Sequence, residues 1–306
     1  MDAPLLLADI GGTNARFTLL RHGTPTPLVA LRLDSFPHME AAIAHYLSQQ
    51  VLPAPPAGAL LAVAGPVAGN SVTLTNRGWV VDGAAISARL GIGPTRVLND
   101  FEALAWALPA LTAADCLAIG PALAPQPGAP LAVLGPGTGL GVGAFLPPNR
   151  VLPGEGGHAT LSAGDDEEAA ILALLRRRHG HVSAERLLSG PGLVALHEAL
   201  AELHGLPPPG LTAAQVTAGA PETLARFCAM LGGFAGNVAL TYGARGGVFL
   251  CGGILPRIPA ALAASAFRAR FEAKGRLSPY LAAIPTWLIT RPDAALVGLA
   301  HLAGQG

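Results

Sequence analysis

The chain has 306 residues, of which 51% are hydrophobic and only 12% charged, and its formal net charge is zero. A chain of this length is expected to form two domains or one unusually large domain. The composition excludes a disordered protein, and the balanced charge gives no basic surface for nucleic acid and no acidic tail for a basic partner.

Two rare residue types exclude further classes. Lys274 is the only lysine and is followed by glycine, so the chain cannot contain a Walker A motif, which needs lysine before Ser or Thr. The three cysteines, Cys116, Cys228 and Cys251, are far apart in sequence and form neither a disulfide framework nor a zinc pattern. No basic segment typical of a signal peptide is seen, and glycine, proline or a charge interrupts every apolar run well short of a membrane span. We expect a soluble cytoplasmic protein without a membrane segment.

The first half of the chain begins with a hairpin. A continuous apolar strand at 4–10, of the kind that is buried on both faces, leads through a glycine turn into a returning strand at 15–23. Apolar spacing then predicts a third strand at 27–36, a helix at 37–51, a strand at 59–67, a short strand at 95–100 and a helix from 101 to 111.

The second half repeats this opening. A proline-rich stretch at 121–130 indicates a boundary or a surface connector. After it, residues 131–147 again form an apolar strand, a glycine turn and a returning strand, which suggests an internally duplicated α/β architecture. Capping and dipole signals predict helices at 162–180 and 191–205, and a buried strand is expected at 246–256. Residues 285–302 read as a strand and a final helix with Asp293 as its N-cap.

The first turn, "DIGGTN", has the composition of a phosphate-binding loop. Asp9 closes a buried strand, and Gly11 and Gly12 allow close backbone approach and positive φ values. Free N–H groups there, with the Thr13 hydroxyl and the Asn14 amide, can surround phosphate oxygens. Asp9 would then need a cation beside the phosphates, and Mg²⁺ held through water suits that role. An ordinary hairpin turn explains this motif alone equally well.

The second turn, "GPGTGLGVG" at 135–143, favours the phosphate interpretation. A strand follows it instead of a helix, so it is not a Rossmann fingerprint. We expect the two turns to converge on one triphosphate. Gly252 and Gly253, after another strand, are candidates for the place where an adenine lies against the backbone.

Four polar residues are candidates for binding an acceptor substrate. Asn99 and Asp100 follow a strand, and Asp100 there can accept a hydroxyl proton, although both residue types are also common helix caps. Glu155 and His158 lie in the glycine-flanked loop "LPGEGGHATL", where they can present hydrogen-bonding groups to a polyol. Glu185 taken alone is better explained as a solvated or capping residue of a helix.

These segments together resemble the bacterial glucokinases of the ATP-dependent, non-ROK type, which belong to the actin-like sugar kinase superfamily. The resemblance rests on "LADIGGTNARF", "LNDFEALAWALP", "GPGTGLGVG", "LPGEGGHATL", "HVSAERLLSGPGLV" and "CGGI", and extends over nearly the whole chain. It implies an α/β, two-domain actin-like (ribonuclease H-like) fold with duplicated mixed-sheet halves and an interdomain cleft. It assigns residues 1–110 plus about 293–306 to a small domain and 111–292 to a large one.

The resemblance also implies a site. Asp100 would be the general base on the sugar's primary hydroxyl, Asp9 would face Mg²⁺, and the likeness implies ATP as the phosphoryl donor. The sugar would be bound by Asn99, Asp100, Thr138, Glu155, His158 and Glu185. The nucleotide would be bound by Ala8, Asp9, Ile10, Gly11, Gly12, Thr13, Gly137, Thr138, Gly139, Gly252 and Gly253.

Glucose phosphorylation at the 6-hydroxyl is the leading hypothesis, and a homodimer is expected because the family is commonly dimeric. The alternatives are a kinase for fructose, mannose or an N-acetylated sugar, a sugar-binding regulator that has lost catalysis, and an actin-like filament protein. A regulator would need a DNA-binding segment, for which the first strand at Leu5 leaves no room. A filament protein would have no use for the Glu155 and His158 loop.

Overall fold

The computed structural model describes residues 3–74, 77–207 and 210–305. The chain divides into two compact units, unit 1 (Met1–Leu111 with Pro292–Gly306) and unit 2 (Thr112–Arg291). Each unit contains one main mixed β-sheet, and the two sheets have closely similar strand orders.

The sheet of unit 1 has the strand order β3-β2-β1-β5-β8, with β4 also paired to β2. Strands β1 and β2 form the predicted opening hairpin, whereas β1, β5 and β8 run parallel. The strands are β1 (Leu5–Ile10), β2 (Asn14–Arg21), β3 (Thr24–Pro25), β4 (Val29–Arg32), β5 (Gly58–Val63) and β8 (Thr95–Asn99). A separate hairpin consists of β6 (Ser71–Thr73) and β7 (Val80–Asp82).

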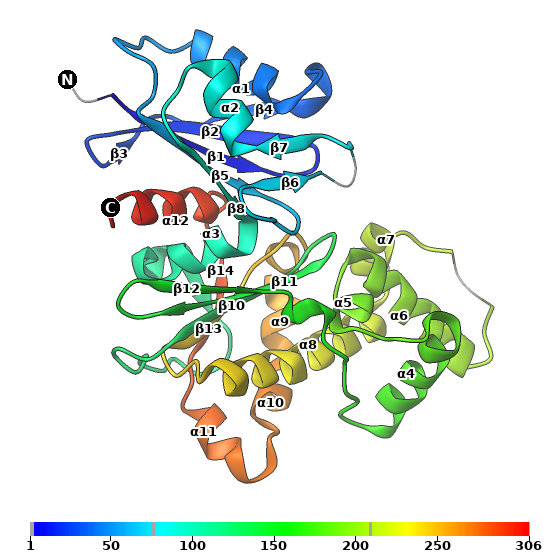
Figure 1. Cartoon of the computed structure of the whole chain (residues 1–306). Helices are drawn as coiled ribbons and strands as arrows, with labels where there is room; N and C mark the ends of the chain where they lie inside the picture. Colours follow the sequence, from blue (N-terminus) through cyan, green and yellow to red (C-terminus); the bar gives the residue numbers. More distant parts are fainter. Residues whose placement is uncertain (1–2, 75–76, 208–209, 306) are drawn as a thin grey trace. The chain divides into compact units, whose positions relative to one another are not determined.

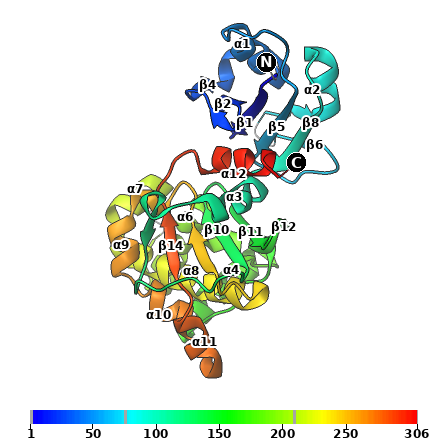
Figure 2. The same ribbon diagram turned by 90° about the vertical axis from the view of Figure 1, so that its left-hand side faces the viewer.

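Helices cover both faces of this sheet, which is why its central strands are apolar on both sides. Helices α1 (Met39–Ser48) and α2 (Gly83–Leu90) lie over one face, and α3 (Asp100–Ala107) and α12 (Ala294–Ala303) lie side by side over the other (Figure 1, Figure 2). Side chains alternate along β1, so Leu6, Ala8 and Ile10 join the core on the α1 side. Asp9 therefore points toward the α12 side.

The predicted strand at 27–36 is wrong over half its length. Only Val29–Arg32 is a strand, and the chain then turns through the 3₁₀ helix η1 (Leu33–Ser35). At this point the Leu33 N–H donates to the carbonyl of Thr13 at 2.9 Å, which ties the segment to the first glycine turn. A second 3₁₀ turn, η2 (Leu108–Ala110), follows α3.

The sheet of unit 2 repeats the design of the first. Its order is β12-β11-β10-β13-β14-β9, with an antiparallel β10–β11 hairpin and parallel β10, β13 and β14. This repetition confirms the predicted duplication of mixed sheets. The strands are β9 (Cys116–Ala118), β10 (Leu131–Pro136), β11 (Leu140–Leu146), β12 (Arg150–Gly154), β13 (Gly247–Leu250) and β14 (Thr286–Ile289).

Helices pack on this second sheet and on one another around one apolar core. The α-helices are α4 (Asp166–His179), α5 (Ala184–Leu187), α6 (Gly190–Leu203), α7 (Ala213–Gly219), α8 (Pro221–Tyr242), α9 (Pro259–Ala264), α10 (Phe267–Glu272) and α11 (Ser278–Ala282). The 3₁₀ helices are η3 (Ala113–Asp115), η4 (Gly156–His158), η5 (Leu255–Arg257) and η6 (Gly275–Leu277). Helices α4 and α6 confirm the two that capping signals predict.

Helix α8 corrects the expectation that every apolar run is broken well short of a membrane span. By length and composition alone this helix is apolar enough to cross a membrane, with a mean hydropathy of 1.3 over 18 residues, but 72% of that window is buried inside unit 2. Its glycines do not end the helix. A Cβ atom on Gly232 would lie 2.1 Å from the carbonyl oxygen of Phe267, and one on Gly236 would lie 2.5 Å from that of Phe271. These glycines therefore allow α10 to pack closely against α8.

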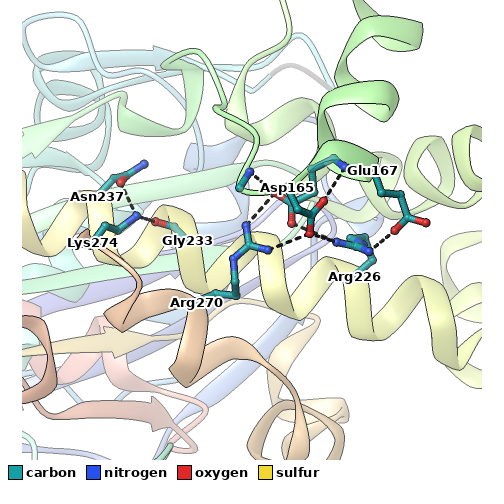
Figure 3. Close-up of polar contacts among 9 residues, drawn as sticks. Asp165, Glu167, Arg226, Gly233, Asn237, Arg270 and Lys274 are labelled. Atoms are coloured by element: carbon teal, nitrogen blue, oxygen red, sulfur yellow. Dashed lines mark hydrogen bonds and ion pairs between the residues drawn. The ribbon is translucent and has the colours of Figure 1, made fainter. Parts of the chain in front are cut away.

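An ion-pair network joins α4, α8 and α10 (Figure 3). Arg226 on α8 contacts both Asp165 and Glu167, and Arg270 on α10 contacts Asp165. The Glu168 carboxylate, only 1% exposed, accepts from Arg270 at 2.9 Å and from the Gly164 N–H at 2.7 Å. Nearby, the Lys274 ammonium donates to the Gly233 carbonyl and to the Asn237 side chain (Figure 3).

We expect Glu168→Ala to destabilise unit 2 by about 2–4 kcal/mol, because it removes the buried acceptor shared by Arg270, the Gly164 N–H and Arg226, whose Nη1 lies 3.5 Å from Glu168 Oε1. The free energy of unfolding in urea, followed by circular dichroism, measures this loss. Glu167→Ala is the matched control. Its carboxylate is 35% exposed and contacts Arg226 alone, so it should cost no more than about 1 kcal/mol. Equal losses in the two variants would contradict a special role for the buried carboxylate.

Candidate active site

The carboxyl ends of the parallel strands of unit 1 meet at one edge of its sheet. In the register of this sheet, Ile10 lies beside Val63, and Val63 lies beside Asn99. Neighbouring strands are about 4.8 Å apart, so the first glycine turn and the start of α3 are separated by about 10 Å along this edge. Such edges are where α/β proteins bind ligands.

Backbone hydrogen bonds hold the first glycine turn. The Gly11 N–H donates to the Asn14 carbonyl at 3.0 Å, and the Thr13 carbonyl accepts from Leu33. Gly11 does not adopt a left-handed φ, so the expectation of positive φ is wrong at this glycine. Thr13 and Asn14 are exposed, so their side chains are accessible to a ligand.

Asp9 has a partner that the sequence interpretation missed. The Arg16 guanidinium lies opposite Asp9 in the β1–β2 register and donates to Asp9 Oδ2 at 3.1 Å and to the Pro292 carbonyl at 3.1 Å. Burial raises the pKa of the Asp9 carboxyl above its ordinary value, and the positive charge and hydrogen bond of Arg16 offset part of this rise. The facing register of a short hairpin is the signal that could have identified this pair.

The raised pKa of Asp9 predicts a pH-dependent stability. The folded state holds this proton more tightly than the unfolded state, so the parent loses stability as pH rises from the ordinary carboxyl pKa, about 4, through the raised value. Asp9→Asn lacks this loss. Urea unfolding at pH 4 and pH 7 should therefore show the parent's free energy of unfolding falling relative to the variant's.

Asp115→Asn serves as the control, because the pKa of Asp115 is shifted in the opposite direction from that of Asp9. Hydrogen bonds from Thr112 hold the pKa of Asp115 below its ordinary value, with Arg291 assisting, so this carboxylate stabilises the fold above the unfolded pKa. Most of this stabilisation is already present at pH 4, so the parent should lose stability relative to that variant as pH falls from about 4 to about 2, and should change little relative to it between pH 4 and pH 7. A gain relative to Asp9→Asn over the same interval would show that the attraction of Arg16 outweighs the burial of Asp9.

The sequence left open whether Asn99 and Asp100 are helix caps or substrate-binding residues, and the structure gives the two residues different positions. Asn99 is the N-cap of α3, with its Oδ1 accepting from Phe101 N at 2.8 Å and from Glu102 N at 3.3 Å. Its Nδ2 donates to the Gly65 carbonyl at 2.9 Å. Asp100 is the first residue of the helix and is partly exposed at the sheet edge. The cap and the Gly65 contact thus fix the backbone that carries Asp100.

The second glycine turn lies at the corresponding edge of unit 2. Gly137 donates to the Gly139 carbonyl at 2.7 Å and accepts from the Gly190 N–H at 2.8 Å, while Thr138 is exposed. A Cβ atom on Gly137 would lie 3.9 Å from Gly253 N, and one on Gly252, whose φ is +93°, would lie 2.3 Å from the Pro136 carbonyl oxygen. The structure therefore brings Gly252 and Gly253 next to the second turn, and only glycine suits position 252.

Three predicted sugar-binding side chains converge beside this turn. His158 Nε2 lies 4.0 Å from Glu155 Oε2 and 4.0 Å from Glu185 Oε1. The Glu155 and His158 side chains are more than 60% exposed, and that of Glu185 is 32% exposed. The three therefore present two carboxylates and one imidazole to solvent within a small area, an arrangement that can accept and donate hydrogen bonds to several hydroxyls.

Glu185 links this cluster to the second turn. Its Oε2 accepts from the Leu140 N–H at 2.8 Å, and a Cβ atom on Gly139 would lie 2.4 Å from that oxygen. The interpretation of Glu185 as a solvated helix residue or a capping partner is therefore incomplete, because its carboxylate fixes the end of the glycine turn. Only the fold brings residues 139 and 185 together.

The predicted site residues thus form two groups, each within one unit. Unit 1 holds the first turn with Asp9, Asn99 and Asp100, and unit 2 holds the second turn, the glycine pair and the Glu155, His158 and Glu185 cluster. Across the described ranges 3–74, 77–207 and 210–305, no three His, Cys, Asp or Glu side chains gather into a set that could hold a metal ion.

Comparison with known proteins places this arrangement in a family. The sequence profile described as Glucokinase matches residues 6–306. The chain belongs to the glucokinase family. A glucokinase of Nitrobacter hamburgensis is 45% identical over 313 residues, which cover 99% of this chain and 98% of that protein. A glucokinase from an Antarctic psychrotroph has a solved structure that superimposes with a TM-score of 0.90 at 37% identity, with all of both chains covered.

The fold extends beyond the glucokinase family. The ROK glucokinase of Streptomyces griseus, solved with glucose and AMPPNP, has a TM-score of 0.65 at 18% identity, with 99% of this chain and all of that chain covered. These findings confirm the resemblance, the actin-like sugar kinase fold and the enzyme class, an ATP-dependent hexose kinase. The assignment of individual residues remains a prediction.

Proposed function

We propose that this member of the glucokinase family transfers the γ-phosphoryl group of ATP to the 6-hydroxyl of glucose. The observation that carries the proposal is the cluster of Glu155, His158 and Glu185 beside the second glycine turn. An actin-like ATPase needs the glycine turns but not a group of side chains suited to a polyol. Hydroxyl-binding groups next to a glycine turn that a phosphate chain can approach closely are what a sugar kinase requires.

The two glycine turns are the proposed phosphate sites. The turns Ala8–Thr13 and Gly137–Gly139 would bind the phosphates of one ATP through backbone N–H groups other than those of Gly11 and Gly137, which donate to the Asn14 and Gly139 carbonyls, with Gly252 and Gly253 beneath the adenine. Asp9 suits Mg²⁺ as a single carboxylate that acts through water, because Arg16 contacts Oδ2 and leaves Oδ1 outside that ion pair. When bound, Mg²⁺ would neutralise charge on the phosphate oxygens.

Asp100 is the proposed general base. As the 6-oxygen forms its bond to the γ-phosphorus and the bond to the ADP oxygen breaks, the hydroxyl proton passes to the Asp100 carboxylate. Asn99 caps α3 and thereby orients Asp100, and its second Nδ2 hydrogen is a candidate donor to the sugar. Glu155, His158, Glu185 and Thr138 would bind the remaining hydroxyls.

The test is a coupled assay for ADP release with ATP, Mg²⁺ and a panel of glucose, fructose, mannose and N-acetylglucosamine. We expect glucose to give the highest kcat/KM, because a site built to bind each hydroxyl rejects analogues that lack one or misplace it. A higher kcat/KM with another hexose would assign a different substrate. Glucose binding without turnover of any sugar would indicate a regulator and overturn the proposed activity.

Two further properties follow from the family and belong to this proposal. We place the enzyme in the cytoplasm, where ATP and glucose meet, and we expect a homodimer. Sedimentation velocity at micromolar concentration would show a species of twice the chain mass if the dimer forms, and a single species of 30.8 kDa if it does not.

A further inference from the structure

The side chain of Arg77 joins three segments of unit 1. Arg77, which lies between β6 and β7, contacts the other two segments: the first glycine turn at Gly12 and η1 at Asp34. Leu74 N donates to the Trp79 carbonyl at 2.8 Å, and Arg77 N donates to the Leu74 carbonyl at 3.1 Å. These bonds anchor the backbone of Arg77, which is 65 residues away in sequence from Gly12.

Arg77 makes two directional contacts and one ring contact. Its Nε donates to the Gly12 carbonyl at 2.9 Å, and its Nη2 pairs with the Asp34 carboxylate. Its guanidinium carbon lies 5.3 Å from the centre of the Trp79 ring, and its side chain is only 16% exposed. Hydrogen bonds from Arg77 first, and from Arg32 second, hold the pKa of Asp34 below its ordinary value, so Asp34 stays ionised. These contacts leave the guanidinium little freedom to move.

The Gly12 contact determines the orientation of a peptide in the turn. In a trans peptide, the C=O of one residue and the N–H of the next point in opposite directions. With the Gly12 carbonyl held on the side of Arg77, the Thr13 N–H points to the other side. The neighbouring Thr13 carbonyl is also occupied, by Leu33 N. Without the Arg77 hydrogen bond, the Gly12–Thr13 peptide is held less firmly in this orientation, because glycine at position 12 permits other backbone angles.

We propose that Arg77 is a positioning residue for ATP: it fixes the Gly12–Thr13 peptide so that the Thr13 N–H faces the phosphates. This inference rests on the proposed role of the first glycine turn in binding ATP. Because Asp34 balances the charge of Arg77, the effect is one of orientation rather than of added positive charge. Arg77 acts through the turn and needs no contact with the reacting atoms.

The test compares Arg77→Met with Arg32→Met. Methionine keeps an unbranched side chain of similar reach but removes every donor. Arg32 also pairs with Asp34, at 3.0 Å, but its side chain is 72% exposed. Arg32→Met is therefore the matched control, since it also removes one arginine from the Asp34 carboxylate. We expect Arg77→Met to raise the KM for ATP by about 5- to 30-fold, as for the loss of a charge-assisted hydrogen bond. The dissociation constant for glucose without nucleotide should change less than about twofold, and Arg32→Met should resemble the parent.

Two measurements separate positioning from loss of folding. Added ethylguanidinium should partly restore the KM for ATP of Arg77→Met, because it can return a donor to the Gly12 carbonyl. Arg77→Lys should have an intermediate KM, since one ammonium cannot reproduce the two-directional fork. An unchanged KM for ATP in Arg77→Met, or equal losses of ATP and glucose affinity with a large fall in melting temperature, would overturn the inference. A parent that phosphorylates no hexose would instead overturn the proposed function.

Discussion

Asp100→Asn should lower kcat by about 10²–10⁴-fold, the usual contribution of a well-placed acid–base group, while the KM for glucose stays within about threefold. Asparagine keeps the size and hydrogen-bonding reach of the side chain but accepts no proton at neutral pH. Asn99 Oδ1 accepts from both Phe101 N and Glu102 N, and an asparagine oxygen at position 100 can still accept the Phe101 N–H that Asp100 Oδ1 accepts at 3.1 Å, so the fold of α3 should survive the substitution. Initial rates at saturating ATP, with glucose varied, measure both constants.

Asp166→Asn is a closely matched control for this experiment. Asp166 is the first residue of α4, just as Asp100 is the first residue of α3, so both substitutions remove one negative charge from a helix N-terminus. Asp166 is exposed and outside the proposed site. Its asparagine variant should keep parental kcat. If Asp100→Asn also keeps kcat within a few-fold of the parent, Asp100 serves α3 alone and the general base must be another group.

Glu155→Gln should raise the KM for glucose by about 10- to 100-fold, which corresponds to the loss of a charge-assisted hydrogen bond to a hydroxyl. The KM for ATP should change less than about threefold, because Glu155 lies in the loop that carries His158 and not in either glycine turn. Its side chain is 65% exposed, so the substitution should not weaken the core. Isothermal titration with glucose, without nucleotide, measures the binding loss separately from turnover.

Glu222→Gln makes the same chemical change at an exposed position in the first turn of α8. It should leave both KM values at their parental levels and so exclude a general effect of net charge. Equal rises in the KM for glucose and for ATP in Glu155→Gln would indicate a disturbed fold rather than a lost sugar contact. No change in either would remove Glu155 from the proposed sugar site.

Local patterns in the sequence predicted much of the fold. The hairpins at the starts of both sheets follow from continuous apolar strands on either side of a glycine turn, and α4 follows from acids in its first turn and arginines in its last. These features depend on neighbours within a few residues, for which propensity and capping rules suffice. The internal duplication could be inferred because the same local pattern occurs twice, whereas the strand order of each sheet came from the structure.

The sequence by itself therefore determined the opening hairpins of both sheets, helices α4 and α6, the family and the residue types of the candidate site. Only the tertiary structure decided their partners: Arg16 beside Asp9, Arg77 on the Gly12 carbonyl, and Glu185 on the Leu140 N–H. The last two contacts join residues 65 and 45 positions apart. The role of the glycines in helix α8 was also decided by the tertiary structure, because they interrupt an apolar pattern in the sequence but allow α10 to pack closely against α8. Local preferences extend over a turn or two, whereas packing selects the partner of a buried polar group from the whole chain.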